Sequence, residues 1–524
     1  MKNFTKQSIM LLIMLSLSGC TGYHSAEPER ESTEGTEVTQ ATEANSYVAD
    51  NEQEEFLEFL DAVNEKNALL DAPSTNLDQY KYDYSSGEPL FTMEDGCIDE
   101  EVNQVTELPQ TISREDAKKE VDWYFRLLRT MYGLYTFYGG DEAFGAARMK
   151  CLEQLDAGSE LLSIEEEYVP MLRDSLSFVR DKHLWIGDVQ MCPDIILLGN
   201  PDVTFSLKNG VFYGGQDGDR EVVSIENEPP QNYLKPAIDK EGRFAYCPYI
   251  QVPENERMET ITVRYQDGGE KQIPLGKETA NSKTGMRKET LYTYEQDGIY
   301  TVQMNRMVRG SSADGPYQEG DDVIRERFLE TAKNLQEASV GVFDLRYNGG
   351  GNGLLADEWF RIYTGEPLQP NYSSLTLRLR MGEDENSLDV LEQDARYRER
   401  GWDVDGSYYV KYPTPQFVDK KGSFLIVRTS DLTCSAAEVF TDMSRNLKNT
   451  LRIGTPTGGC ITGDQSYFGI EMPWSKLSFT LGTKLYYWDE DYFSEGWGFV
   501  PDLYLTGSYV ESRLDLFIER YLLP

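Results

Sequence analysis

The clearest chemical candidate in the chain is Ser435, which stands between a predicted buried strand and a predicted helix. The strand is the apolar run from Phe424 to Val427, and apolar residues at helical spacing follow the serine. A hydroxyl at such a turn lies beside free backbone N–H groups, which can hold the oxyanion that nucleophilic attack creates. The alternative is that Ser435 is only an N-cap, the commoner role of a serine before a helix.

His183 is the second candidate, because it is the only histidine besides His24 of the N-terminal segment. It belongs to an Asp181-x-His183 turn that we place between a predicted helix and a short predicted strand. A lone histidine is usually structural. However, a serine hydrolase that uses histidine as its base has no other candidate in this chain.

A glycine-rich loop from Asn348 to Gly353 lies between a predicted buried strand, Val340 to Phe343, and a predicted helix, Leu354 to Tyr363. Glycines at such a place let backbone N–H groups converge on an anion or a carbonyl oxygen. A phosphate loop would need a following Lys-Ser/Thr pair, which is absent. The sequence therefore favours an oxyanion loop over nucleotide binding.

Five short motifs occur in one order between Thr111 and the C-terminus. They are Asp181-x-His183, Asp344-Leu-Arg-x-Asn348-x-Gly-Gly351, Ser435-Ala-x-Glu438, Gly454-x-Pro-Thr457 and Glu495-Gly-x-Gly498-x-x-Pro-Asp502. Each motif is weak alone, but the ordered series resembles the tail-specific (C-terminal-processing) and tricorn-like serine peptidases. The resemblance implies an α/β fold whose catalytic domain is crotonase- or ClpP-like, often with a PDZ module before it.

The resemblance also implies roles for single residues. Ser435 corresponds to the nucleophile of these peptidases. Gly350 or Gly351, together with the amide of Ala436, corresponds to the donors that hold the oxyanion.

The general base depends on the branch of the family. Members with a Ser–Lys dyad place their lysine where this chain has Cys460, so that mechanism does not transfer. Tricorn-like members use a histidine and a glutamate, which correspond to His183 and Glu495. Lys182 replaces the small residue usual before this histidine, and we expect its charge to lower the histidine pKa. In this scheme His183 takes the proton of Ser435 and returns it to the leaving amine, while Glu495 orients the imidazole.

The cysteines include one pair that the resemblance brings together. Cys434 precedes the nucleophile, and Cys460 takes the place of a lysine that reaches the nucleophile in related enzymes. Two arrangements are open, a disulfide that fixes the loop after Thr457 or two reduced thiols that fill the space of the lysine.

The N-terminus is typical of an exported lipoprotein. Lys2 and Lys6 precede an apolar run that is too short to span a bilayer, and Leu17-Ser-Gly-Cys20 resembles a bacterial lipobox. We expect residues 1–19 to be a signal peptide and Cys20 to be lipidated. Residues 20–51 are expected to form an acidic flexible tether. The protein would then be anchored in the bacterial cell membrane, at the surface or on the periplasmic face. A plain signal peptide with a chance cysteine is the alternative.

Three regions are expected after the tether. Residues 52–190 form an N-terminal helical region that carries the histidine turn, and residues 290–524 form the crotonase/ClpP-like peptidase domain. Residues 195–285 are β-rich and resemble a PDZ domain, with a short helix expected near Tyr233 to Ile238. Such a domain captures an extended peptide on a sheet edge. A β-rich insertion without a ligand remains open.

Composition bounds the choice of partners. With 50 basic and 90 acidic side chains, the formal charge of −40 argues against nucleic acid and against electrostatic docking on anionic lipid. We predict an exported, membrane-anchored serine endopeptidase that cleaves peptides or unfolded proteins through Ser435, His183 and Glu495. No cofactor or metal is implied, and no oligomeric state is indicated. The alternatives are an inactive surface lipoprotein that binds peptides with this fold, and an enzyme that uses Cys434 as nucleophile.

Overall fold

The computed structural model describes residues 42–70, 73, 75–86, 91, 109–215, 218–281, 285–308, 320–378, 387–420, 423–464, 467–489 and 491–523. The predicted signal peptide and Cys20 lie outside these residues. The chain divides into two compact units, Met1–Asn51 and Glu52–Pro524. Helix α2 (Thr42–Ala68) begins inside the first unit, so the last part of the expected tether is helical. Within the described part of the chain, no helix is both long enough and apolar enough to cross a membrane.

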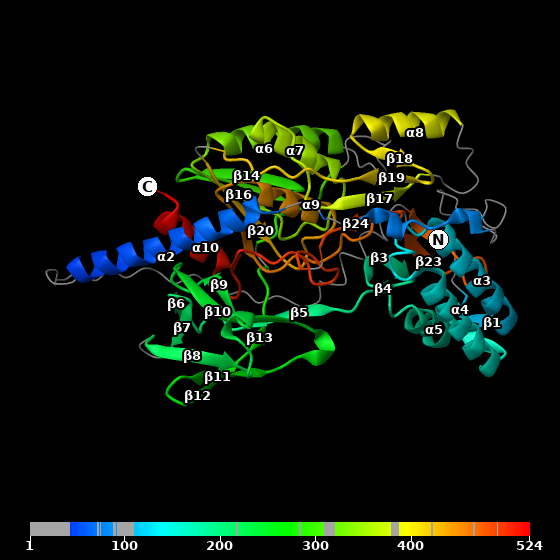
Figure 1. Cartoon of the computed structure of the whole chain (residues 1–524), viewed down its shortest axis with the longest axis horizontal. Coiled ribbons are helices and arrows are strands. Elements are labelled where there is room, and N and C mark those ends of the chain that lie inside the picture. The colour runs from blue at the N-terminus through cyan, green and yellow to red at the C-terminus, as the bar shows by residue number, and fades with distance from the viewer. Residues whose placement is uncertain are drawn as a thin grey trace, which may run out of the picture. The chain divides into compact units, whose positions relative to one another are not determined.

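The second unit is built on a ten-stranded sheet (Figure 1). Six adjacent strands pair in parallel: β9, β25, β21, β20, β16 and β15. Antiparallel strands flank these six on both sides. In spatial order the strands are β13 (Gly276–Lys277), β5 (Ile195–Gly199), β10 (Phe244–Pro253), β9 (Leu234–Ile238), β25 (Leu503–Tyr504), β21 (Thr450–Gly454), β20 (Phe424–Thr429), β16 (Val340–Asp344), β15 (Ile299–Met304) and β14 (Leu291–Gln296).

Helices cover both faces of the parallel part of this sheet, as a sheet buried on both sides requires (Figure 1). On one face lie α6 (Asp321–Glu337), α7 (Leu354–Thr364) and α9 (Ala436–Met443). There Phe440 stacks on Phe343 with ring centroids 4.4 Å apart. On the other face lie α10 (Val510–Tyr521) and residues 52–68 of α2. There Phe56 of α2 packs against Phe517 of α10.

The N-terminal helical region contains α3 (Arg114–Met131), α4 (Gly140–Ala157) and α5 (Val169–Ser175). Ser113 is the N-cap of α3, since its hydroxyl accepts the amide of Asp116 at 3.1 Å. Its first strand, β1 (Thr111–Ser113), pairs with β2 (Leu161–Ser163).

A four-stranded sheet shares its core with these helices. It consists of β22 (Tyr467–Glu471), β23 (Ser478–Leu481), β3 (Asp181–Ile186) and β4 (Val189–Met191). His183 lies within β3, so the predicted turn is in fact a strand. A second four-stranded sheet, of β18 (Asp403–Asp405), β19 (Tyr408–Lys411), β17 (Ser373–Leu377) and β24 (Lys484–Tyr487), contributes to the same core, and α8 (Leu388–Glu399) precedes β18.

The β-rich block contains an antiparallel sheet of β12 (Glu270–Pro274), β11 (Thr260–Tyr265), β8 (Arg220–Ile225), β7 (Val211–Gly214) and β6 (Ser206–Lys208). The helix expected near Tyr233 to Ile238 is wrong, because this segment is β9. Its backbone pairs with β10 and β25, and Pro236 inside it would disrupt a helix. Through β9, β10 and β5 the block shares the main sheet with residues 290–524.

Candidate active site

Ser435 stands between β20 and α9 with an unusual backbone. Its φ is 55° and its ψ is −122°, a region that residues other than glycine rarely occupy and that is found at functional sites. The Ser435 amide donates to the Cys460 carbonyl oxygen at 3.1 Å and to the Glu438 carboxylate at 3.0 Å. The Ser435 Oγ lies 3.2 Å from Nε2 of His183. The structure therefore brings together two predicted residues that are 252 positions apart.

His183 is buried, and β3 fixes its position. Its amide donates to Oδ1 of Asp181 at 2.7 Å, and its carbonyl oxygen accepts the hydroxyl of Thr480. Burial lowers the pKa of His183, although the charges of Asp181 and Asp464 act in the opposite direction. The lowered pKa was predicted, but its cause is burial and not the neighbouring lysine. The imidazole is therefore neutral near pH 7, as a general base must be.

Lys182 extends toward the loop that holds the catalytic lysine in the dyad enzymes. Its Nζ donates to the Gly458 carbonyl oxygen at 2.7 Å. Burial lowers its pKa, but Cys434 and other nearby groups outweigh this effect, so the pKa is raised overall. A lysine that serves as a base needs a lowered pKa. Lys182 therefore keeps its proton near neutral pH.

Glu495 is buried beside the histidine strand, but its contacts differ from those of the predicted triad. Its Oε1 accepts the amide of Lys182 at 3.0 Å, and its Oε2 accepts the amides of Ile461 at 3.1 Å and Thr462 at 2.9 Å. Among the hydrogen bonds of the described residues, none joins Glu495 to the imidazole of His183. The carboxylate holds the two segments that flank the histidine, because their backbone N–H groups converge on it.

No catalytic role was predicted for the carboxylate of Asp181, although it belongs to the same motif as His183. It is fully buried, and Oδ2 accepts the hydroxyl of Tyr132 at 2.7 Å. Burial raises its pKa to about 6, with a further contribution from the charge of Glu495. Asp181 is the charge that acts most strongly on His183. Among the acids near His183, it is therefore Asp181, rather than Glu495, whose charge raises the histidine pKa.

The glycine loop packs directly against Ser435. A Cβ built on Gly350, where φ is +105°, would lie 2.7 Å from Cβ of Ser435 and 3.2 Å from the amide nitrogen of Ala436. The Gly350 amide itself donates to Oδ1 of Asn348 at 2.9 Å. Gly350 is therefore not a free oxyanion donor, because an asparagine two residues earlier already binds its N–H. Of the predicted donors, Gly351 and Ala436 have amides without a hydrogen bond among the described residues.

Glu438 joins two of the sequence motifs. Its Oε1 accepts the hydroxyl of Thr457 at 2.6 Å and the amide of Gly459 at 2.9 Å. Its Oε2 accepts the amides of Ser435 at 3.0 Å and Cys460 at 2.8 Å. Burial raises the pKa of Glu438 to about 7, and these donors oppose the shift. The side chain thus ties the start of α9 to the loop after β21.

The cysteines at the site are free thiols, so the reduced arrangement is the one present. The Cys460 Sγ lies 3.7 Å from Nε2 and 3.9 Å from Nδ1 of His183, and Cys434 is its thiol hydrogen-bond partner. The described contact of the Cys434 thiol with the backbone is at the Asp431 carbonyl oxygen, 3.9 Å away. The thiol in contact with His183 is therefore Cys460 and not Cys434.

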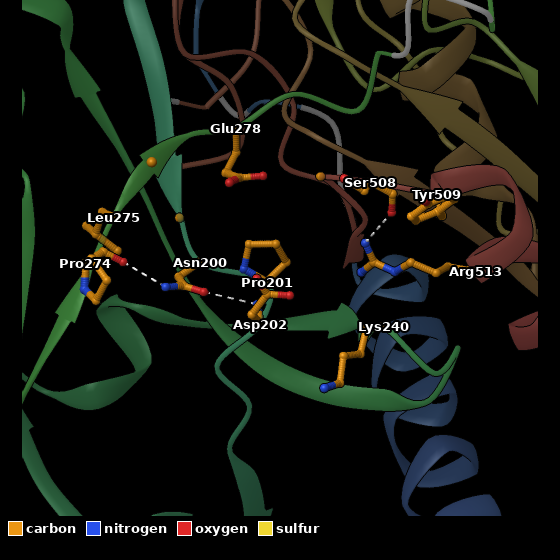
Figure 2. A pocket seen from close by; sticks show the side chains of 13 residues that line it. Asn200, Pro201, Asp202, Lys240, Pro274, Leu275, Glu278, Ser508, Tyr509 and Arg513 are labelled. Carbon is orange, nitrogen blue, oxygen red and sulfur yellow. Dashed lines mark hydrogen bonds between the residues drawn. The ribbon is translucent and has the colours of Figure 1, made fainter. Parts of the chain in front are cut away.

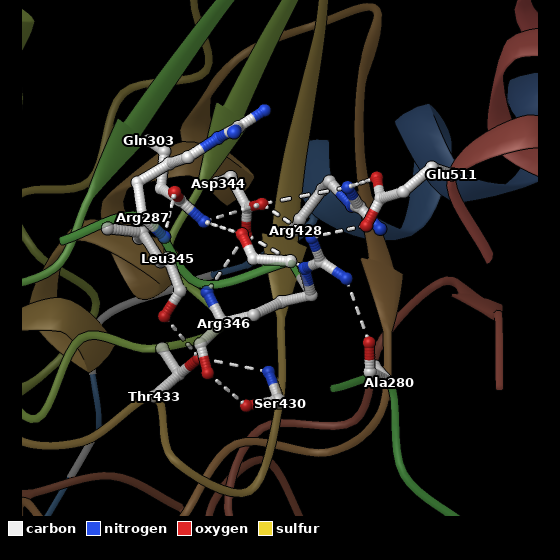
Figure 3. Close-up of polar contacts among 11 residues, drawn as sticks. Ala280, Arg287, Gln303, Asp344, Leu345, Arg346, Arg428, Ser430, Thr433 and Glu511 are labelled. Atoms are coloured by element: carbon white, nitrogen blue, oxygen red, sulfur yellow. Dashed lines mark hydrogen bonds and ion pairs between the residues drawn. The ribbon is translucent and has the colours of Figure 1, made fainter. Parts of the chain in front are cut away.

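An ionic network lies at the ends of β16 and β20 (Figure 3). Arg346 pairs with Asp344 at 2.7 Å and with Glu511 at 2.8 Å, and Arg428 joins the same two acids. The Arg346 carbonyl oxygen accepts the hydroxyl of Ser430, in the loop that leads to the nucleophile. These contacts fix the glycine loop and the serine loop to the ends of β16 and β20.

A cavity of about 550 Å³ lies between β5, β13 and the start of α10 (Figure 2). Asn200, Lys240, Glu278 and Arg513 are among the side chains that line it, and none of the predicted site residues does. Arg513 is already bonded to the carbonyl oxygens of Asp239 and Thr506. The cavity is therefore separate from the Ser435 site.

No family model and no curated protein matches the chain. Its structure resembles several solved proteases. Mature CPAF in complex with lactacystin matches with a TM-score of 0.39 and 13% identity over 78% of this chain and 97% of that chain. The photosystem II D1 C-terminal processing protease matches with a TM-score of 0.31 and 12% identity over 74% and 92%. The tricorn protease matches with a TM-score of 0.33 and 12% identity over 78% and 37%. The neighbours therefore include C-terminal-processing and tricorn proteases, the groups that the motifs resemble.

Proposed function

We propose that this protein is a serine endopeptidase whose nucleophile is Ser435 and whose general base is His183. The observation that carries the proposal is the 3.2 Å contact between Oγ and Nε2, made by a serine with a strained backbone at a helix N-terminus. A serine and a neutral histidine at this distance form the nucleophile–base pair of acyl transfer. A structural serine has no need of such a pair.

In the proposed mechanism, Nε2 of His183 takes the Oγ proton as Ser435 attacks the peptide carbonyl carbon. The tetrahedral oxyanion accepts hydrogen bonds from the amides of Ala436 and Gly351. The imidazolium then gives its proton to the leaving amine, and an acyl-enzyme remains on Ser435. Water attacks this ester with His183 again as base, which releases the new carboxyl terminus. Asp181 stabilises the imidazolium by its charge, and Glu495 holds β3 in place.

The finer architecture belongs to the same proposal. We interpret the main sheet with α6, α7 and α9 as a crotonase-like catalytic core, and residues 195–285 as a PDZ-like block that admits the substrate chain. The block joins the catalytic loops directly, since Arg346 donates to the Ala280 carbonyl oxygen at 2.8 Å and Asn281 to Asp431 at 3.2 Å. A peptide held on the block would therefore lie on an element tied to the serine loop.

The cellular setting is proposed from the sequence alone. A lipid on Cys20 would hold the enzyme on the outer face of the cell membrane, with peptides or unfolded proteins as substrates. Partitioning between detergent and aqueous phases tests the anchor. We expect the full chain in the detergent phase and a Cys20→Ala variant in the aqueous phase, and equal recovery of both in the aqueous phase would contradict the anchor.

The peptidase proposal is tested with a denatured protein mixture and mass spectrometry of the new termini. The enzyme should generate internal cleavages that Ser435→Ala does not generate, with a loss of about 10⁶-fold in rate. If both proteins bind peptides and neither cleaves them, the chain is the non-enzymatic binding protein. Substantial cleavage by the purified Ser435→Ala variant would show that another residue is the nucleophile.

A further inference from the structure

Two thiols lie side by side at the turn that carries Ser435. The Ser435 amide donates to the Cys460 carbonyl oxygen at 3.1 Å. Beside it, the Gly458 amide donates to the Thr433 carbonyl oxygen at 2.9 Å. A Cβ built on Gly458 would lie 2.3 Å from Sγ of Cys434, and Cys434 is the hydrogen-bond partner of the Cys460 thiol. These contacts place the two sulfurs next to each other, where the loop after β21 meets the start of α9.

The two thiols differ in their access to solvent. Cys434 is half-buried, whereas Cys460 is buried and its sulfur lies 3.7 Å from Nε2 of His183. An oxidant in solution therefore meets Cys434 first. A solvent-accessible thiol with a second thiol in reach is the arrangement of cysteine pairs that respond to oxidants.

The charges around the pair also favour Cys434 as the attacking thiol. Lys182 extends its ammonium toward the same loop, where Nζ donates to the Gly458 carbonyl oxygen at 2.7 Å. Of the groups that stabilise the Lys182 ammonium, Cys434 has the largest effect. The interaction is mutual, so the ammonium stabilises the Cys434 thiolate, which is the nucleophilic form of cysteine. The hydrogen bond with Cys434 and burial together raise the pKa of Cys460, so Cys460 stays protonated until Cys434 has reacted.

We propose that Cys434 and Cys460 form a reversible disulfide that inhibits the peptidase, with a small-molecule disulfide as the oxidant. The Cys434 thiolate attacks one sulfur of the oxidant, and the other sulfur leaves as a thiolate. Cys460 then gives up its proton and attacks the Cys434 sulfur of this mixed disulfide, so a second small thiolate leaves. In total, two protein thiols are oxidised to one disulfide, and the oxidant is reduced to two thiols that take up the two protons.

The bridge would act on both members of the proposed catalytic pair. An S–S bond of about 2.05 Å is much shorter than the contact between two free thiols. Closing it draws the residue before Ser435 toward Cys460 and removes the Cys460 sulfur from its contact with His183. Because a displacement of about 1 Å costs on the order of 10²-fold in rate, we expect kcat to fall by that factor. The bridge stands on the two thiols alone, whereas the inhibition rests on the proposed function.

The test incubates the reduced full chain with excess oxidised glutathione and maps the non-reduced peptides by mass spectrometry. We expect a bridge between Cys434 and Cys460 and a fall in kcat that a phosphine reductant reverses. Cys434→Ser should form no bridge and keep its activity in the oxidant, whereas Cys460→Ser should stop at a glutathione adduct on Cys434. The matched control is Cys192→Ala, because Cys192 is half-buried too but burial raises its pKa to about 12. This control should form the bridge as wild type does.

Ser435→Ala separates this proposal from the proposed function. It should form the same bridge, because disulfide formation needs neither the Ser435 hydroxyl nor activity. A folded wild type that yields no bridged peptide after prolonged oxidation would overturn the disulfide. A bridged wild type with unchanged kcat, or an equal loss of activity in oxidised Cys434→Ser, would overturn the inhibition and leave the peptidase assignment intact. A reduced wild type that cleaves no peptide yet forms the bridge would contradict the proposed function and support the disulfide.

Discussion

At the scale of single residues, the site is a histidine between two acids with different tasks. Asp181 acts on the charge of His183, and Glu495 binds the backbone on either side of it. The family resemblance assigns the acidic role to Glu495, because sequence motifs cannot show which carboxylate acts on the charge of the imidazole. The structure divides that role between two residues that are both buried.

The pH dependence of kcat/KM should reflect the lowered pKa of His183. Protonation of the base stops the reaction, so activity should rise with pH and level off once the imidazole is neutral. Because burial places this pKa below the ordinary 6.5, the midpoint of the acid limb should lie below pH 6.5. A pH–rate profile of a fluorogenic peptide measures it, and a midpoint well above 6.5 would contradict the account.

Amide substitutions of Asp181 and Glu495, made one at a time, separate the roles of the two carboxylates. Asp181 raises the histidine pKa by its charge, so Asp181→Asn should move the acid limb to lower pH and reduce kcat. Glu495→Gln should reduce kcat, because the amide NH₂ of glutamine would face backbone donors and displace β3. It should shift the acid limb less than Asp181→Asn does. Equal shifts in the two profiles would mean that Glu495 acts on the ring directly. Glu241→Gln, at an exposed turn, is the control.

At the scale of elements, the site is made where β3, the glycine loop, the start of α9 and the loop after β21 meet. Local patterns predicted several of these pieces. The apolar runs of β20 and β16 and the helix α7 after the glycine loop follow from residue types within one element. The strand β9 did not follow from them, because its conformation is fixed by pairing with β10 and β25. The contacts of the Glu438 carboxylate did not follow from local patterns either, since burial and long-range folding create them.

Alanine substitutions at Gly350 and at Gly349 test the packing of the glycine loop, because each adds one methyl group. Gly350→Ala would place Cβ 2.7 Å from Cβ of Ser435 at a φ of +105°, so the serine must shift. A displacement of this kind costs on the order of 10²-fold in kcat. Gly349→Ala meets no atom within 4 Å and should remain near wild type in kcat and in thermal midpoint. If the two variants lose activity equally, packing against Ser435 is not the cause.

At the scale of the whole second unit, one sheet runs from the β-rich block to the catalytic loops. The network of Asp344, Arg346, Arg428 and the exposed Glu511 lies at the ends of β16 and β20 and reaches the block at Ala280 (Figure 3). The sequence suggested separate regions because composition changes along the chain. The shared sheet arises from strand pairing that no local pattern reports.

Arg346→Met should destabilise this unit strongly. Asp344 would lose its main partner while still buried, and breaking a buried pair in this way costs about 3–5 kcal/mol. We expect a lower thermal midpoint by calorimetry and a lower kcat from loss of the loop support. The matched control is Arg264→Met, which removes an exposed pair with Glu270 and should change stability by at most about 1 kcal/mol. Equal midpoints for the two variants would show that the network contributes little.

The central claim is that Ser435 is a nucleophile activated by His183, and labelling with a fluorophosphonate tests it most directly. The reagent phosphonylates a serine only where a base and an oxyanion site activate it. Intact-mass and peptide mapping should find one adduct on wild type, located at Ser435. The adduct should be absent from Ser435→Ala and strongly reduced in folded His183→Ala. A folded wild type that cleaves peptides yet remains unlabelled at Ser435, or labels as fast without His183, would contradict the account.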